Sequence, residues 1–133
     1  VPPFDKIEVA HYKPAFEKGM EEQKKEIDAI VNNPEEPTFE NTIVAFDRSG
    51  ELLTKVMYAF RGQSSVNTTD EIQALEQELY PVLSAHSDDI SLNPALFTRV
   101  KAVYDKQASM NLNKEQKKLL EETYKGFVRQ SRR

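Results

Sequence analysis

The chain has 133 residues, no cysteine and a formal net charge of −4. The length suits one domain with its own core, and the lack of cysteine excludes disulfides, thiolate nucleophiles and cysteine-based metal sites. The acidic balance argues against nucleic-acid binding, which usually needs a basic surplus. No apolar run reaches the length of a membrane span and no signal segment opens the chain. Because the chain starts in mid-motif at Val1, which leaves room for a removed upstream signal segment, the compartment stays open between cytoplasm and periplasm.

The first helix is predicted from Tyr12 to Val31, where Asn32-Asn33-Pro34 ends it. Pro14 is expected in its opening turn, where a missing amide hydrogen costs nothing. Residues 1–11 are expected to lie as an extended arm over a helical bundle. The apolar line of the helix consists of Phe16, Met20, Ile27 and Ile30.

The second helix is predicted from Phe39 to about Gln63. Pro37 and Thr38 form its start, because the Thr38 hydroxyl can accept a hydrogen bond from an orphaned backbone amide. Gly50 lies on the apolar side, either to let a neighbouring helix approach closely or as a tolerated defect. That side consists of Phe39, Ile43, Phe46, Gly50, Leu53, Met57 and Phe60, with Phe46 and Leu53 expected in one core.

Three further helices follow, each with its own start signal. Thr68-Thr69-Asp70-Glu71 fits a capping box, and Pro81 predicts a kink in the helix that follows. Asn93-Pro94 opens the fourth helix, and Asn113 with Gln116 opens the fifth. No segment alternates with period two. The pattern predicts an all-α, up-and-down bundle of about five helices over residues 12–130, within a single domain of residues 1–133.

Few residues offer chemistry. His11 and His86 are far apart in sequence, and a metal site would need both of them plus carboxylates. Asp89 stands three residues after His86, which allows a pair on one helix face, but the place of His86 on the apolar line favours a buried structural histidine. Neighbouring acids on a helix point about 100° apart, so solvated faces are favoured over acid/base dyads. These pairs are Glu21-Glu22, Glu35-Glu36, Asp88-Asp89 and Glu121-Glu122.

The remaining candidates are hydroxyl groups. The serines lack the strand–turn–helix frame of a nucleophile elbow, and Tyr80, Tyr104 and Tyr124 fit core positions better than a cofactor box. The serines in question are Ser64, Ser65, Ser84 and Ser87. The sequence thus predicts no catalytic, cofactor-binding or metal-binding residues in this chain.

Three segments in order carry a family resemblance. They are Pro2-Pro3-Phe4-Asp5-Lys6-Ile7, Pro37-Thr38-Phe39-Glu40-Asn41-Thr42-Ile43 and Leu83-Ser84-Ala85-His86-Ser87-Asp88-Asp89-Ile90. Together they resemble the N-terminal helical region of the zinc peptidyl-dipeptidases, also called dipeptidyl carboxypeptidases, of the thimet oligopeptidase family. The resemblance runs from Val1 to about Arg129 and does not extend over Gln130-Ser131-Arg132-Arg133.

The resemblance implies a non-catalytic part of a longer hydrolase. Members of the family bind zinc through His-Glu-x-x-His plus a distant glutamate, a motif that this chain lacks. They are mostly helical, with a deep channel, and the N-terminal helices contribute to one wall. The expected partners are the catalytic part of the same protein and oligopeptide substrates, from which the parent would release C-terminal dipeptides. The alternative is an independent helical module that binds a protein or peptide.

Overall fold

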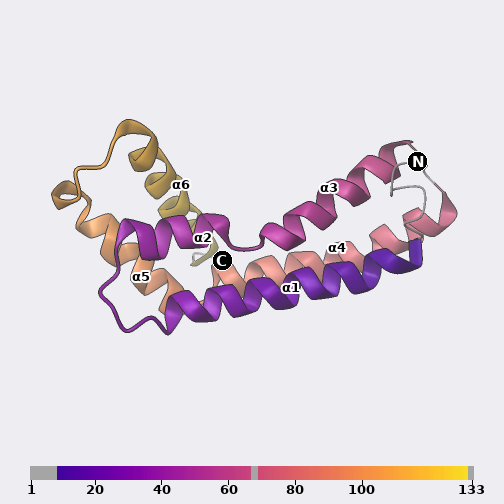
Figure 1. Cartoon of the computed structure of the whole chain (residues 1–133), viewed down its shortest axis with the longest axis horizontal. Coiled ribbons are helices and arrows are strands. Elements are labelled where there is room, and N and C mark those ends of the chain that lie inside the picture. Colours follow the sequence, from indigo (N-terminus) through magenta and orange to yellow (C-terminus); the bar gives the residue numbers. More distant parts are fainter. Residues whose placement is uncertain (1–8, 67–68, 132–133) are drawn as a thin grey trace. The chain divides into compact units, whose positions relative to one another are not determined.

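The structure is a computed structural model that describes residues 9–66 and 69–131. All its regular elements are helical, and no strand occurs in these residues (Figure 1). In chain order they are α1 (Val9–Val31), the π-helix η2 (Phe39–Val44), α2 (Ala45–Arg48), α3 (Glu51–Val66), α4 (Asp70–Ser91), α5 (Pro94–Asp105), the 3-10 helix η3 (Gln107–Ser109) and α6 (Lys114–Ser131). With η2, α2 and α3 taken as one joined segment, the described residues form five helices besides the three-residue η3, and the all-α prediction is confirmed.

The chain divides into two compact units. Unit 1 comprises residues 1–25 and 50–86, and unit 2 comprises residues 26–49 and 87–133. Both α1 and α4 therefore contribute one part to each unit, and each unit has its own apolar core.

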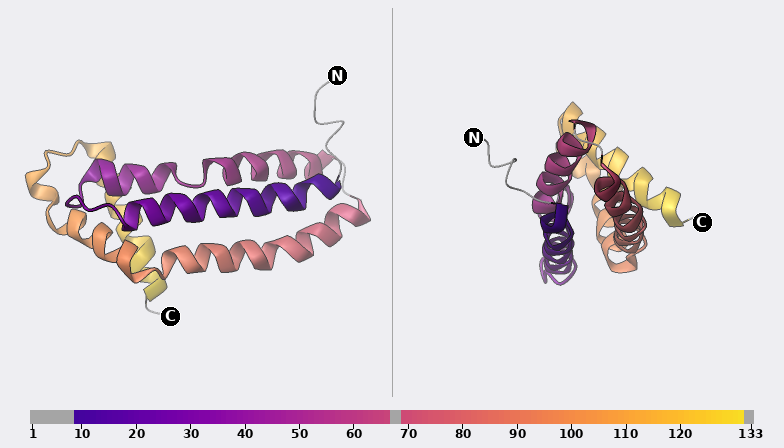
Figure 2. Two further views of the ribbon diagram at one scale, coloured as in Figure 1. Left: turned by 60° about the horizontal axis from the view of Figure 1, so that its bottom comes forward. Right: turned by 90° about the vertical axis from the view of Figure 1, so that its right-hand side faces the viewer.

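The core of unit 1 is built by α1, α3 and α4. The α1 and α3 helices run side by side (Figure 2), and Gly19 allows this: a Cβ atom there would come within 2.8 Å of the Leu53 Cα. The Phe60 ring meets the edges of two α1 rings, with centroid distances of 5.1 Å to Tyr12 and 5.5 Å to Phe16. The buried residues of this core are Tyr12, Phe16, Met20, Leu53, Phe60, Ile72, Leu75 and Leu79.

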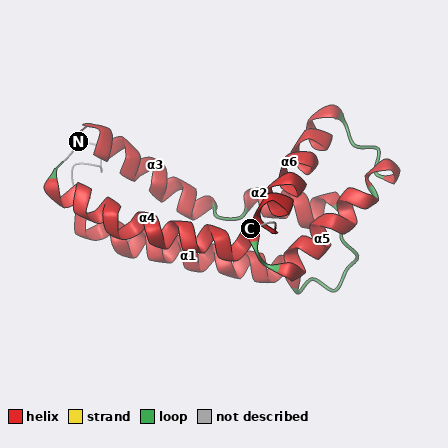
Figure 3. Cartoon of the chain, turned by 180° about the vertical axis from the view of Figure 1, so that it is seen from behind, coloured by secondary structure: helices red, strands yellow, loops and turns green. Residues whose placement is uncertain are grey.

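The core of unit 2 lies among the end of α1, η2, the end of α4, α5 and α6. Half-buried aromatic rings from α2, α5 and α6 pack against it, and the Tyr104 and Tyr124 rings stack with centroids 4.0 Å apart. The buried residues are Ile27, Ile30, Phe39, Ile43, Ile90, Leu96, Val100, Val103, Leu120 and Phe127. Figure 3 shows these helices with the loops that join them.

The first helix begins earlier than the sequence indicates. It starts at Val9, so Pro14 lies in its second turn and not in its opening turn. Proline has no amide hydrogen for the Ala10 carbonyl, yet the helix continues because Tyr12 and Phe16 are buried in the core of unit 1. Residues 1–8 of the expected extended arm lie outside the described residues.

The second helical segment spans the expected range but is interrupted. Ser49 is extended (ψ 147°) and Gly50 has a φ of 76°, in the left-handed region. A Cβ atom on Gly50 would lie 2.6 Å from Nε2 of the Gln23 side chain. This break corrects the prediction that Phe46 and Leu53 share one core: Leu53 is buried in unit 1, whereas Phe46 is half-buried against the core of unit 2.

The helix starts follow the sequence closely. Asn93 caps α5, and at the start of α6 the backbone amides of Asn113 and Gln116 each donate to the side-chain oxygen of the other residue at 2.8 Å, so both predictions are confirmed. At α4 the cap is Thr69, whose hydroxyl oxygen accepts from the Ile72 amide at 3.2 Å, while Thr68 lies outside the described residues. Pro81 lies inside α4, as the expected kinked third helix requires.

Candidate functional site

A polar network of unit 2 surrounds the start of η2. The Thr38 hydroxyl accepts from the Asn41 amide at 3.0 Å, and the Asn41 side-chain oxygen accepts from the Thr38 amide at 2.7 Å. This reciprocal capping box confirms Thr38 as the predicted N-cap. The Asn41 oxygen also accepts from the buried Thr42 hydroxyl at 2.8 Å, and its amide nitrogen donates to the Glu36 carbonyl at 3.0 Å.

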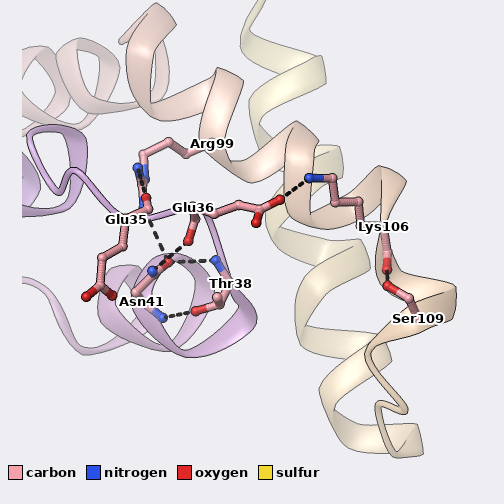
Figure 4. Close-up of polar contacts among 7 residues, drawn as sticks. All are labelled: Glu35, Glu36, Thr38, Asn41, Arg99, Lys106 and Ser109. Carbon is pink, nitrogen blue, oxygen red and sulfur yellow. Dashed lines mark hydrogen bonds and ion pairs between the residues drawn. The ribbon is translucent and has the colours of Figure 1, made fainter.

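Arg99 of α5 ties the connection before η2 to the rest of unit 2. Its guanidinium donates to the carbonyls of Asn33 (3.1 Å) and Glu35 (3.3 Å). The other terminal nitrogen donates to the Asn41 side-chain oxygen at 3.3 Å (Figure 4). One planar cation thus holds three acceptors that are 58 to 66 residues away in sequence.

An ion pair closes the same network at its edge. Lys106, just after α5, binds the Glu36 carboxylate, and the hydrogen bond from the ammonium lowers the pKa of Glu36 below its usual value. Ser109 donates to the Lys106 carbonyl at 2.8 Å, which fixes the turn that carries the lysine (Figure 4). Both charged side chains are more than half exposed, so solvent screens the pair.

This network serves to fix the backbone. Most of its hydrogen bonds bind backbone groups or cap a helix, and the others join Asn41 to Thr42 and Arg99, and Glu36 to Lys106. The residues of the network include no histidine and no hydroxyl set beside a base, which general acid–base or nucleophilic catalysis requires. Sequence reasoning found Thr38 but missed Asn41, Arg99 and Lys106. Asn41 was detectable, since it stands at the third helical position after Thr38, whereas no local pattern identifies the other two.

The two histidines lie in different surroundings. His11 is exposed on α1. His86 is buried in unit 1, and its Nε2 lies 2.7 Å from the Gln23 side-chain oxygen of α1. Asp89, the candidate partner of His86, is exposed on α4. The arrangement fits a structural histidine that joins α4 to α1.

The acidic pairs lie on solvated helix faces or bind nearby lysines. Glu21 and Glu22 both lie 3.6 Å from Lys25, and Glu22 also lies 3.1 Å from Lys18. The hydrogen bond from Lys18 lowers the pKa of Glu22. Exposed positions on α4 and α6 hold Asp89, Glu121 and Glu122, and Asp88 is half-exposed.

The hydroxyl candidates divide between surface and core. Ser84 and Ser87 are exposed on α4, and the side chains of Ser64 and Ser65 lie outside the described residues. Tyr104 and Tyr124 are half-buried, close to expectation. Tyr80 is 47% exposed, so its prediction as a core residue was wrong: it stands one position after the buried Leu79, which turns it about 100° around the helix axis, away from the core.

The described residues contain neither a group of metal ligands nor a membrane-spanning helix. Within residues 9–66 and 69–131, no three His, Asp or Glu side chains are grouped so that they would hold a metal ion. These residues therefore do not fit the zinc of the family resemblance. None of the described helices has the length and apolar character needed to cross a membrane.

Comparison with known proteins relates the chain to peptidases. It is 42% identical over 127 residues to dipeptidyl carboxypeptidases of Salmonella typhimurium and Escherichia coli, and 24% identical over 127 residues to oligopeptidase A of Haemophilus influenzae. No family model matches. The matches cover 96% of this chain but only 18–19% of each relative, so the chain spans about a fifth of the length of the curated relatives it matches.

The match extends over both units and all the described helices, and it is far closer to the dipeptidyl carboxypeptidases than to oligopeptidase A. The relatives named oligopeptidase A support the resemblance to the wider oligopeptidase family. The chain is thus homologous to the N-terminal region of the bacterial dipeptidyl carboxypeptidases.

Proposed function

We propose that this chain is the non-catalytic N-terminal helical part of a zinc metallopeptidase that releases dipeptides from the C-termini of oligopeptides. In that protein, the two helical units contribute to a wall of the substrate channel, and the zinc and its ligands lie downstream of Arg133. The observation that carries the proposal is the 42% identity over 127 residues to two dipeptidyl carboxypeptidases.

The dipeptidase branch is favoured over the oligopeptidase branch by the same comparison. Identity to oligopeptidase A is 24% over the same length. The inventory of this chain agrees with a supporting role: its polar network caps and ties backbone, and its buried histidine binds a glutamine. An independent binding module, the alternative function, has no specific observation in its favour.

The proposal is tested with the coding sequence downstream of Arg133 and with the protein that it encodes. We expect a His-Glu-x-x-His segment downstream, and release of C-terminal dipeptides from a blocked peptide by the whole protein, lost on chelation and restored by zinc. The matched control is the same protein with both histidines of that segment replaced by alanine, which should be folded and inactive. A downstream sequence without the segment, or a whole protein that cleaves internal bonds only, contradicts the proposal.

A further inference from the structure

The outward side of α4 in unit 1 exposes an aromatic ring beside a proline. Tyr80 is 47% exposed, on a flank of the helix about a quarter turn away from the core side, where Ile72 and Leu79 are buried. A hollow of about 430 Å³ lies along this outward side. It is lined by Gln73, Glu76, Gln77, Tyr80 and Pro81. These residues are spaced by three and four, so they form one continuous face of the helix.

The charged side chains of α4 are all acidic. Between Asp70 and Ser91 there is no lysine or arginine. The carboxylates of the helix are Asp70, Glu71, Glu76, Glu78, Asp88 and Asp89. Among the described residues, only Glu78 has a basic partner, Lys13 of α1. By contrast, α1 and α6 carry lysines among their acids. Within residues 9–66 and 69–131, the negative charge on α4 is thus largely uncompensated.

The hollow also offers acceptors for a cation. Pro81 has no amide hydrogen, so the Gln77 carbonyl, one turn earlier on the same face, lacks its usual helical donor. The Glu76 carboxylate and the exposed Tyr80 ring lie beside it. A carbonyl, a carboxylate and an aromatic face together suit a guanidinium or an ammonium group, through hydrogen bonds, an ion pair and a cation–π contact.

We infer that this face of α4, defined by the five residues that line the hollow, is a docking surface for a basic segment of the longer peptidase, led by an arginine or lysine side chain that enters beside Tyr80. The inference rests on the proposed function, because the segment belongs to the four fifths of the relatives that this chain does not cover. A second copy of the same face fits poorly, since the face carries no cation. A substrate C-terminus is an anion, so the carboxylates of this helix repel it.

The absence of cysteine gives a direct test. Tyr80→Cys introduces a thiol in the hollow, and Tyr58→Cys is the matched control, because Tyr58 lies on α3 in the same unit and is 73% exposed. Each variant is made in the 133-residue chain and in the longer natural protein, and labelling by a maleimide is followed by mass spectrometry of the peptide that contains the position. Circular dichroism checks that each variant is folded.

We expect the thiol at position 80 to be labelled about tenfold more slowly in the longer protein than in the 133-residue chain, with little change at position 58. Equal labelling of position 80 in both proteins would overturn the docking surface. So would protection that is already present in the 133-residue chain and that rises with its concentration, because that result assigns the face to self-association.

A charge variant tests the chemistry of the partner. Glu76→Lys should lower the melting temperature of the longer protein by several degrees, Glu76→Gln by less, and neither should change that of the 133-residue chain. An equal shift in both proteins, or none in either, would overturn the basic partner. Since these readouts do not use peptide cleavage, they separate a failure of the docking surface from a failure of the proposed activity.

Discussion

Thr38 supplies the acceptor for one backbone amide at the start of η2, and its own amide is satisfied by Asn41. We therefore predict that Thr38→Ala lowers the free energy of unfolding by about 1 kcal/mol, and that Thr38→Ser or Thr38→Asp recovers most of the loss. Urea unfolding of the 133-residue chain measures the effect. A neutral alanine variant, or an aspartate variant no better than alanine, would contradict the cap.

The stability loss of an Asn41 variant can be compared with that of Thr38→Ala. Its side-chain oxygen accepts from Thr38, Thr42 and Arg99, and its amide nitrogen donates to Glu36. Removing it leaves several donors without their partner, including the hydroxyl of the fully buried Thr42. Asn41→Ala is expected to destabilise the chain more than Thr38→Ala does, and the reverse order would mean that the hydroxyl cap dominates the network.

The ion pair between Glu36 and Lys106 makes a pH-dependent contribution. The hydrogen bond and charge of Lys106 lower the pKa of Glu36 in the folded chain below its usual 4.5. The stabilisation is thus present above pH 4.5 and is lost as the pH falls through the folded pKa. We predict that Lys106→Met or Glu36→Gln flattens the decline in stability below that pH, with no further effect when the two are combined.

Unfolding midpoints between pH 7 and pH 3 measure this effect, at low salt because the pair is exposed. Repeating the series at high salt should shrink the difference between the natural chain and the variants. An acid decline that is as steep in both variants as in the natural chain would show that the pair does not link stability to protonation.

At the scale of the elements, the break at Ser49-Gly50 assigns Leu53 and Phe46 to different cores. Leu53 is 8% exposed in unit 1, and Phe46 packs on Phe127 of unit 2 with ring centroids 5.4 Å apart. We predict that Leu53→Ala costs about 2–5 kcal/mol through lost transfer energy and a cavity. Because the two residues have no core neighbours in common, Phe46→Ala should add to it within about 0.5 kcal/mol.

Urea unfolding of both single variants and of the double variant checks this. A double variant that departs from the sum by more than the additivity margin would place the two side chains in one cooperative core. An unchanged stability for Leu53→Ala would contradict its burial between α1, α3 and α4.

Helix starts could be predicted from sequence because their cause is local. Thr38, Asn93 and Asn113 each satisfy a backbone amide two or three residues ahead. The break at Gly50 could not, since a glycine on an apolar seam also fits a continuous helix packed against a neighbour. The side chain that crowds this position is that of Gln23, which is distant in sequence. Arg99 was missed for a similar reason: its acceptors are 58 to 66 residues away in sequence, and two of them are backbone carbonyls, which no sequence pattern marks.

For the whole molecule, we predict that the 133-residue chain binds no zinc tightly and hydrolyses no peptide. The described residues hold no group of metal ligands, and His11 and His86 lie in different surroundings. Calorimetric titration with zinc and a cleavage assay with a blocked tripeptide measure both properties. A stoichiometric site of about micromolar affinity or better, or turnover abolished by a chelator, would contradict the prediction.

The sequence predicted which side of each helix is buried better than it predicted the number of cores. The apolar line of α1 reads as one stripe, yet Phe16 and Met20 belong to the core of unit 1 while Ile27 and Ile30 belong to that of unit 2. Helical periodicity specifies a direction around the helix axis and carries no information on how far along the axis one core extends. The division into units depends on the partners that each turn contacts.

The backbone at Gly50 is left-handed, a conformation that L-residues rarely adopt. With a φ of 76°, its backbone is strained for an L-residue and relaxed for a D-residue. L-alanine there would also push against the Gln23 side chain, which holds His86. D-alanine, introduced by chemical synthesis, places its methyl group in the other direction. The difference in stability between the L-alanine and D-alanine variants at position 50 therefore measures the combined cost of the left-handed backbone and of displacing the Gln23 side chain.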